Sequence, residues 1–178
     1  LFRSSAASDV YKRQDDILQP CKEFIDQYEK IIFLHVRRGD NVGREDYHPI
    51  VSFDYYDRAR KYFDDDVNIL VCTDDPEWCA EQSYFDDDRF LLNTDVPRYD
   101  HLCLEGDGTH KHSCVPYTDL CLMSLCQGAI LAPSTLGWWG AWLQNGKGPV
   151  VAPKNWFGSK MSHFCLLYTS DAADERNS

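Results

Sequence analysis

Short, unbroken apolar runs alternate with helix-like segments along this chain. Ile31 to Val36 (IIFLHV) is almost entirely apolar, as a strand buried on both faces inside a parallel sheet must be. Further strands are predicted over residues 67–72, 90–92, 128–132 and 149–152. Helices are predicted between them, over residues 53–63, from Asp75 onward, over 117–126 and after Pro133. This alternation predicts an α/β fold with a Rossmann-like, doubly wound parallel sheet.

The composition restricts the kinds of partner. The chain has 18 Lys and Arg residues against 29 Asp and Glu residues, and a formal net charge of -11. Such a protein repels phosphate backbones, so nucleic acid is excluded as a general partner. The chain is 43% hydrophobic, which is enough to form a core. It has no apolar run of about 18 residues, the length that a membrane-spanning helix needs.

The two ends of the chain are predicted to be non-native. Residues 4–14 (SSAASDVYKRQ) and 165–175 (CLLYTSDAADE) can be translated from one DNA segment and from its reverse complement. An inverted repeat at both ends of a reading frame is typical of adapter DNA that was translated by mistake. We therefore interpret residues 1–14 and 165–178 as adapter-derived, and residues 15–164 as one natural domain of a protein cut at both ends.

The cysteines leave several interpretations open. Of the eight, Cys165 lies in the predicted non-native tail, and the others are Cys21, Cys72, Cys79, Cys103, Cys114, Cys121 and Cys126. Those inside apolar runs are expected to be buried free thiols. Cys103 and Cys114 flank a polar loop over residues 93–116 and would pair in an oxidising compartment. Nearby histidines also allow zinc, although the C-x10-C spacing matches no strong zinc pattern: His101, His110 and His112.

Polar residues follow three of the predicted strands at their carboxyl ends, where open α/β sheets bind ligands. The first group is His35, Arg37, Arg38, Gly39 and Asp40. The second group is Thr73, Asp74 and Asp75, and the third is Ser134 and Thr135. Arginines and a hydroxyl-bearing helix start fit phosphate oxygens, whereas carboxylates fit the N–H donors of guanine or the hydroxyls of ribose. Together these groups predict a site for a purine nucleotide.

The paired arginines and the acidic runs also allow interpretations other than a nucleotide site. Paired arginines often form an ion-pair network with aspartates, and this chain has many aspartates. Arg38-Gly39-Asp40 spells an adhesion tripeptide, but that use requires an exposed loop tip and this one abuts a buried strand. The acidic runs at residues 64–66 and 86–88 precede strands and therefore lie at the wrong edge of the sheet for the predicted site. We interpret both as solvated turns.

Several motifs together resemble one enzyme family. HVRRGD, HPI, FDYY, CTDDPEWC, DLCLMSLCQGAILAPSTLGWWGAWL and VVAPKNWF span about residues 33–158. They resemble the α-1,2-fucosyltransferases of glycosyltransferase family 11, while HxRRGD alone is shared with α-1,6- and protein O-fucosyltransferases. The resemblance implies a GT-B-like fold of two Rossmann-like domains. Residues 15–164 would then be its C-terminal, donor-binding domain, with the N-terminal domain missing.

The resemblance also implies a reaction. The enzyme would transfer L-fucose from GDP-fucose to the 2-hydroxyl of a galactose-containing glycan, with inversion and without a metal or other cofactor. The fragment would be inactive alone. The alternatives are a GDP-sugar-binding pseudo-enzyme without transfer activity and a metal-dependent transferase of another fold. The family occurs in the bacterial cytosol and in the Golgi lumen, so the compartment stays open, and membrane attachment is expected only through a missing N-terminal anchor.

The resemblance implies a set of phosphate ligands. Arg37 would be the main diphosphate ligand and also act in catalysis, and Arg38 would support it. Ser134 and Thr135 would hold the β-phosphate side. Asp40 would orient the arginine loop. These roles fit elementary chemistry, because negative charge develops on the diphosphate as the sugar leaves, and without a metal it needs guanidinium groups and a helix dipole.

The nucleoside and the acceptor would use other residues. His35 and either Asp74 or Asp75 would lie near the guanosine. The loop NVGREDYHPI resembles that of α-1,6-fucosyltransferases, and the resemblance implies Glu45 as the catalytic base, with Asp46 and His48 nearby. Acceptor choice is expected to depend on the missing domain and on residues 93–116.

One further motif is rich in tryptophan. Trp138, Trp139 and Trp142 have the apolar spacing of a core-facing helix, so we expect them in the core rather than stacked on a sugar.

Overall fold

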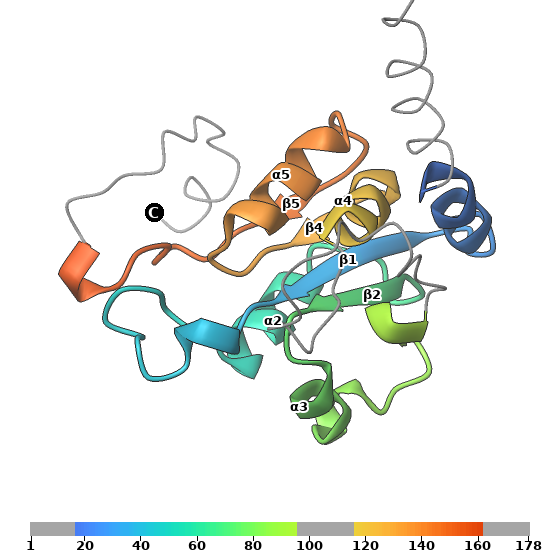
Figure 1. The fold of residues 1–178 in the computed structure, drawn as a ribbon. Helices are drawn as coiled ribbons and strands as arrows, with labels where there is room; N and C mark the ends of the chain where they lie inside the picture. The colour runs from blue at the N-terminus through green and yellow to red at the C-terminus, as the bar shows by residue number, and fades with distance from the viewer. Residues whose placement is uncertain (1–16, 96–115, 162–178) are drawn as a thin grey trace, which may run out of the picture.

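The protein forms a five-stranded parallel sheet in the order β3-β2-β1-β4-β5 (Figure 1). The structure is a computed structural model that describes residues 17–95 and 116–161. The strands are β1 (Ile31–Val36), β2 (Asn68–Thr73), β3 (Phe90–Leu92), β4 (Ala129–Ile130) and β5 (Val150–Val151). β1 pairs with β2 over its whole length, from Ile31 opposite Asn68 to Val36 opposite Thr73. The predicted Rossmann-like parallel sheet is confirmed.

Four helices follow the strands as the sequence predicts: α2 (Phe53–Arg60), α3 (Pro76–Ala80), α4 (Pro116–Leu125) and α5 (Thr135–Leu143). A further helix over residues 17–25 precedes β1. Ser52 caps α2, because its side chain accepts a hydrogen bond from the Tyr55 backbone N–H. Asp75 caps α3 in the same way, so this helix begins where the sequence predicts, and Pro76 lies in its first turn.

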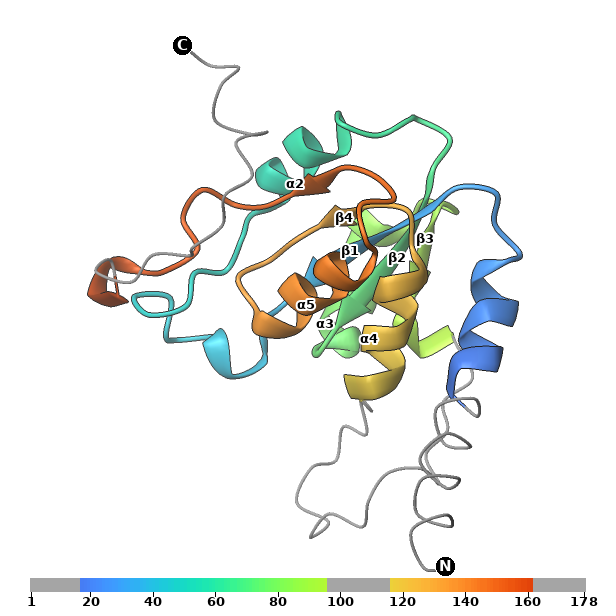
Figure 2. The same ribbon diagram turned by 90° about the horizontal axis from the view of Figure 1, so that it is seen from above.

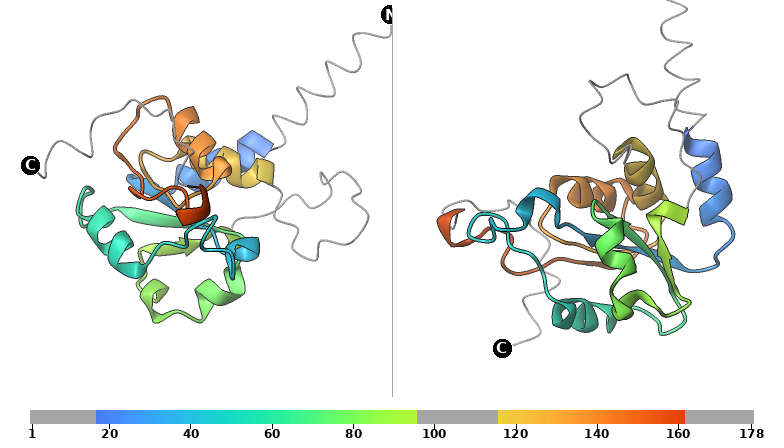
Figure 3. Two further views of the ribbon diagram at one scale, coloured as in Figure 1. Left: turned by 90° about the vertical axis from the view of Figure 1, so that its left-hand side faces the viewer. Right: turned by 60° about the horizontal axis from the view of Figure 1, so that its bottom comes forward.

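Helices cover both faces of the sheet. The helix over residues 17–25, α4 and α5 lie on one face, and α2 and α3 lie on the other (Figures 1 and 3). Alternate residues of β1 enter the two cores: Phe33 packs with Leu122 and Met123 of α4, whereas Leu34 packs with Tyr56 of α2. The sheet is therefore doubly wound.

The strand order reverses between β1 and β4. From β1 the chain moves outward through β2 to β3, and then α4 returns it to the other side of β1, where β4 pairs with Phe33 and Leu34. The carboxyl ends of β1 and β4 therefore flank a topological switch point, which is the usual binding position in an open α/β sheet.

The prediction that the α5 tryptophans lie in the core is wrong for Trp139 and Trp142, whereas Trp138 is half-buried. Trp139 is 45% exposed and Trp142 is 62% exposed, and the buried residues of α5 include Gly137 and Gly140 instead. A Cβ atom at Gly140 would lie 2.6 Å from the Cβ of Met123, so the Met123 side chain of α4 packs directly on the Gly140 backbone of α5. Because the glycines of α5 make its buried contacts, the apolar spacing of the tryptophans marks the outer face of the helix.

Some predictions fall outside the described residues. These include most of the loop over residues 93–116, with Cys103 and Cys114 and the histidines His101, His110 and His112, and the predicted adapter-derived ends. The described cysteines are free thiols, as expected for those in apolar runs. Among the described helices, none has the length and apolar character needed to cross a membrane.

Candidate functional site

A cavity of about 530 Å³ opens at the switch point. Seven residues of the three predicted groups line it: His35, Arg37, Asp40, Thr73, Asp74, Ser134 and Thr135. They come from the carboxyl ends of β1, β2 and β4, which the sheet topology brings to one edge. Arg38, Asp75 and Glu45 are not among the residues that line this cavity.

Arg37 is held at the cavity wall by two carboxylates. Its Nη1 donates to Asp74 Oδ2 at 2.5 Å, and its Nη2 donates to Asp40 Oδ1. The side chain of Arg37 is still 32% exposed, so the guanidinium keeps access to the cavity. A guanidinium carries five N–H donors, and these two ion pairs occupy two of them. Arg37 is thus a fixed cation with donors to spare.

Asp74 fixes the turn that follows β1. Its Oδ1 accepts a hydrogen bond from the Arg38 backbone N–H at 2.9 Å, while its Oδ2 accepts from Arg37. Gly39 has a φ of +22°, and a Cβ atom there would lie 2.2 Å from Asp74 Oδ2. The glycine of the RRGD motif is therefore required by the close approach of Asp74.

Arg38 points away from the cavity and towards α3. Its guanidinium carbon lies 3.7 Å from the centroid of the Trp78 ring, and its Nε donates to Asp75 Oδ2 at 3.3 Å. Asp75 also accepts from the Trp78 backbone N–H at 3.2 Å, so one carboxylate joins the helix start to the arginine. The ion-pair network weighed as an alternative for the two arginines is therefore present. The donor-binding roles of Arg38 and Asp75 stay predictions.

His35 is a buried, neutral imidazole at the base of the cavity. The residue is 3% exposed, and burial, followed by the charge of Arg37, lowers the pKa of His35 to about 4. Among the described residues, none makes a hydrogen bond with its Nδ1 atom. A Cβ atom at Gly137 would lie 2.5 Å from this Nδ1, so the first turn of α5 covers the ring.

The amino terminus of α5 also forms part of the cavity wall. Ser134 is the N-cap residue, and its side chain makes no capping hydrogen bond. Ser134 and Thr135 both line the cavity, and Thr135 is exposed. A helix amino terminus with adjacent hydroxyls favours an anion. The cavity is thus bordered by a guanidinium on the β1 side and by a helix start on the β4 side.

The sequence analysis did not identify one buried carboxylate of the site. Asp119 of α4 is 5% exposed and lines the cavity, and its Oδ1 accepts from Asn93 Nδ2 at 3.2 Å. The same Asn93 Nδ2 lies 3.3 Å from the Thr73 carbonyl oxygen, at the end of β2. An aspartate inside the apolar run DLCLMSLC was the signal, because a carboxylate is rarely buried without a function or a partner.

A comparison with known protein families bears on this site. The sequence model described as Glycosyl transferase family 11 matches residues 12–167. The chain belongs to glycosyltransferase family 11. The match covers the whole sheet and every residue that borders the cavity, so the cavity lies within a glycosyltransferase domain.

Curated relatives of this family 11 chain are bacterial. It is 29% identical over 162 residues to an O-antigen biosynthesis glycosyltransferase, WbnK, from Escherichia coli, covering 83% of this chain and 48% of the relative. It is 32% identical over 133 residues to an alpha-1,2-colitosyltransferase from Escherichia coli, covering 71% of this chain and 41% of the relative. The chain thus spans about half the length of the curated relatives it matches.

One solved structure is also similar. The crystal structure of fucosyltransferase NodZ from Bradyrhizobium aligns with a TM-score of 0.42 and 17% sequence identity, over 72% of this chain and 41% of that one.

The loop after β1 carries the predicted base of the family 11 site. Glu45 is exposed, and its Oε1 accepts a hydrogen bond from the Gly43 backbone N–H at 3.0 Å, which lowers the pKa of Glu45. His48, in the same loop, lines the cavity. The loop is fixed to the segment after β5, because the Gly158 N–H donates to the Tyr47 carbonyl oxygen at 3.0 Å (Figure 2).

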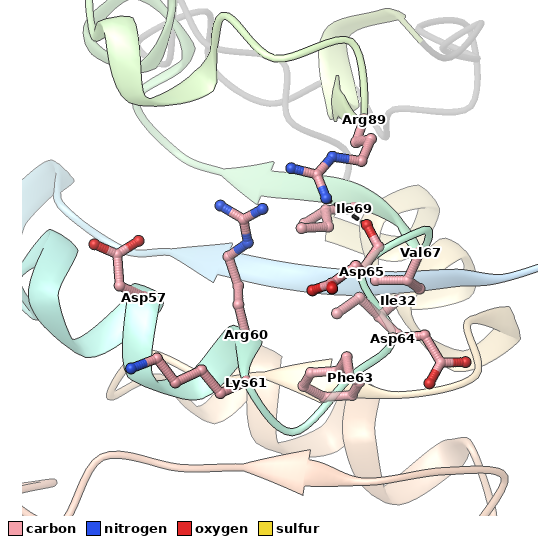
Figure 4. A pocket seen from close by; sticks show the side chains of 10 residues that line it. All are labelled: Ile32, Asp57, Arg60, Lys61, Phe63, Asp64, Asp65, Val67, Ile69 and Arg89. Carbon is pink, nitrogen blue, oxygen red and sulfur yellow. Dashed lines mark hydrogen bonds between the residues drawn. The ribbon is translucent and has the colours of Figure 1, made fainter.

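A second, smaller cavity of about 190 Å³ lies at the opposite edge of the sheet (Figure 4). It is lined by three cationic and three acidic side chains, namely Arg60, Lys61 and Arg89 with Asp57, Asp64 and Asp65. Arg89 donates to Asp87 and to the Asp65 carbonyl oxygen. Because the charges balance, this cavity does not favour an anion as the switch-point cavity does. The acidic runs lie at this edge in exposed turns, as predicted, and Asp64 is 70% exposed.

In the part of the chain that the structure describes, no three His, Cys, Asp or Glu residues are grouped so that they could hold a metal ion.

Proposed function

We propose that this family 11 domain binds GDP-fucose and carries the donor half of an enzyme that transfers L-fucose to the 2-hydroxyl of a galactoside. The observation that supports this proposal is the pairing of Arg37 and the α5 start in the wall of one cavity at the switch point. The reaction would form an α-1,2 linkage with inversion and without a metal. The colitosyltransferase relative is also named for an alpha-1,2 linkage.

The diphosphate would lie between Arg37 and the α5 start. The C1–O bond of the sugar breaks towards the β-phosphate, so negative charge grows on the diphosphate as GDP leaves. Arg37 is already oriented by Asp40 and Asp74 and needs little reorganisation when that charge develops. The Ser134 and Thr135 hydroxyls and the helix dipole would act from the α5 side. Asp40 is 67% exposed and is free to turn away when a phosphate replaces it.

The guanine base would lie against α4. The Asp119 carboxylate lines the cavity and fits the adjacent N1–H and N2–H₂ donors of guanine, which adenine and uracil lack as a pair. His35, a neutral ring that lines the cavity, would contact the nucleotide from the end of β1. These contacts would make the site prefer GDP over ADP and UDP, because only guanine offers this adjacent pair of donors to the carboxylate.

The acceptor would react on the side of the sugar opposite the diphosphate. Its 2-oxygen forms a bond to C1 while the bond from C1 to the diphosphate oxygen breaks, and the configuration inverts. The hydroxyl proton passes to a base on the protein. The resemblance assigns this base as Glu45, and the cavity geometry adds His48 as a second candidate.

A second donor sugar deserves a direct test. The alpha-1,2-colitosyltransferase relative is 32% identical to this chain. Colitose differs from fucose in lacking the 3-hydroxyl group, so a site that hydrogen-bonds that hydroxyl favours fucose, and an apolar contact there favours colitose. The two GDP sugars should be offered in parallel to the same protein.

The first test is calorimetric titration of GDP, UDP and GDP-fucose into the chain with a chelator present. We expect GDP and GDP-fucose to bind and UDP to bind at least tenfold more weakly. Arg37→Ala should abolish binding, whereas Arg44→Ala, an exposed arginine of the same loop that does not line the cavity, should have no effect. Equal binding of UDP and GDP, or unchanged binding by Arg37→Ala, would refute the proposal. Binding of GDP-fucose without transfer by a full-length relative would favour the pseudo-enzyme.

A further inference from the structure

The outer face of α5 carries a continuous aromatic stripe. Thr135, Trp138, Trp139 and Trp142 are spaced i, i+3, i+4 and i+7, so they share one side of the helix. Trp139 is 45% exposed and Trp142 is 62% exposed. The Trp138 and Trp142 rings are stacked, with centroids 5.6 Å apart and planes at 9°, and the Trp139 ring meets Trp138 edge-on at 4.8 Å. The three indoles therefore form one ordered unit.

This stripe begins at the rim of the switch-point cavity. Thr135 lines the cavity and lies on the same face of α5 as the three tryptophans of the stripe. Trp142 lies seven residues further on, about 10 Å along the helix axis. Because Cα–Cβ bonds in a helix tilt towards its amino terminus, the indoles lean towards the cavity end of α5. The outer face and the cavity are thus parts of one surface.

We propose that this stripe, Trp138, Trp139 and Trp142, is a stacking platform for the saccharide chain of the acceptor. This inference rests on the proposed function, because the acceptor hydroxyl must reach a sugar whose diphosphate lies at the α5 start. A saccharide approaching that point passes over Thr135.

The chemistry of the indoles fits this occupant. The C–H groups on one face of a pyranose ring carry small positive charges and match the negative face of an indole ring. The indole N–H is a donor for sugar hydroxyls. The order of the three rings also lowers the conformational entropy that binding costs, since the stacked indoles are fixed before the ligand arrives.

The stripe can be tested through its own signals. The chain has five tryptophans, so protein labelled with ¹⁵N at the indoles gives five N–H resonances, which single Trp→Phe variants assign. Lactose is the probe, and sorbitol at the same concentration is the control, because it has hydroxyls but no pyranose ring. We expect lactose, and not sorbitol, to shift the resonances of Trp138, Trp139 and Trp142 while those of Trp78 and Trp156 stay in place.

Variants make the test quantitative. Trp142→Ala should weaken lactose binding about tenfold, the loss of one stacking face. Because Trp142 is 62% exposed, the variant should remain folded, which its other indole resonances report. Tyr62→Ala removes another exposed aromatic ring, 55% exposed, outside the stripe, and should bind lactose like the unchanged chain.

Three results would overturn the platform. The first is that lactose shifts none of the stripe resonances, and the second is that it shifts only Trp156, which lines the cavity. The third is that the resonances of Trp138, Trp139 and Trp142 change with protein concentration and not with lactose. This result would show that the face forms a contact between two copies of the chain. Titration with GDP tests the proposed function separately, because GDP should move the Trp156 resonance. If GDP leaves the Trp156 resonance in place while lactose shifts the resonances of Trp138, Trp139 and Trp142, the proposed donor site is refuted and the stacking platform is supported.

Discussion

The guanidinium carbon of Arg38 lies 3.7 Å from the ring centroid of Trp78, whereas the neighbouring Arg37 lines the cavity. Two adjacent arginines thus face different surroundings. The Trp78 ring continues the contact, since it stacks on Phe53 with centroids 5.8 Å apart. Arg38 therefore anchors the turn after β1 to α3 and to the aromatic core beside α2.

Replacing the two arginines should give different results. Arg37→Ala should abolish GDP binding with little change in stability. Arg38→Ala should lower the free energy of unfolding by about 1–2 kcal/mol, through lost cation–π and ion-pair contacts, and should weaken GDP binding only partly. Urea denaturation and calorimetry measure the two effects. In a double-mutant cycle with Trp78→Leu, we expect a coupling of about 1 kcal/mol. Additive losses would show that Arg38 does not act through Trp78.

The glycine of the RRGD motif should resist substitution. Gly39→Ala places a Cβ atom 2.2 Å from Asp74 Oδ2, so Asp74 must move away from Arg37 and Arg38. We expect the free energy of unfolding to fall by about 1–3 kcal/mol and GDP binding to weaken. Gly43→Ala is the matched control, because Gly43 has a φ of +80° but no atom within 4 Å of an added Cβ. It should show only a conformational cost of about 1 kcal/mol, with unchanged GDP binding.

Stability should depend on pH through His35. Its pKa is lowered to about 4 in the folded state, whereas an unfolded histidine titrates near pH 6.5. Between these values the unfolded chain binds more protons than the folded one. The contribution of His35 is therefore fully present above about pH 6.5 and is lost as the pH falls towards 4, by up to about 3 kcal/mol.

The measurement is urea denaturation at intervals across this pH range, for the unchanged chain and for His35→Gln. The variant should lose the part of the slope that His35 provides, while the titration of carboxylates remains in both proteins. Identical slopes would mean that His35 takes up its proton in the folded state, and would contradict its burial as a neutral ring.

Much of the fold was predictable because its signals are local. The buried run at β1, the helix start at Asp75, and the polar residues at strand ends each reflect short-range chemistry, and the structure has them where the sequence predicts. The rule that ligands bind at the carboxyl ends of parallel strands predicted a shared site for His35, Arg37 and Ser134, and all three line one cavity.

The features that could not be predicted from the sequence depend on packing between helices and strands. The periodicity of α5 shows that Trp138, Trp139 and Trp142 share a face, but not which face is buried, because Gly137 and Gly140 allow a closer approach than any side chain would. The separation of Arg37 from Arg38 depends on Trp78, which comes from another element. Asp119 became a site residue only when α4 was placed against the end of β2.

The identity of the catalytic base is a final point that mutation can decide. Glu45 does not line the cavity, and its carboxylate is a poor proton acceptor, because the Gly43 N–H stabilises its charged form and lowers its pKa. His48 lines the cavity. In a full-length family 11 enzyme that carries both residues, we expect His48→Asn to lower kcat about 10²–10⁴-fold, with GDP affinity unchanged, and Glu45→Gln to lower it much less. The reverse ranking would assign proton transfer to Glu45, as the resemblance to α-1,6-fucosyltransferases implies. It would require the loop over residues 43–48 to turn inwards when the acceptor binds.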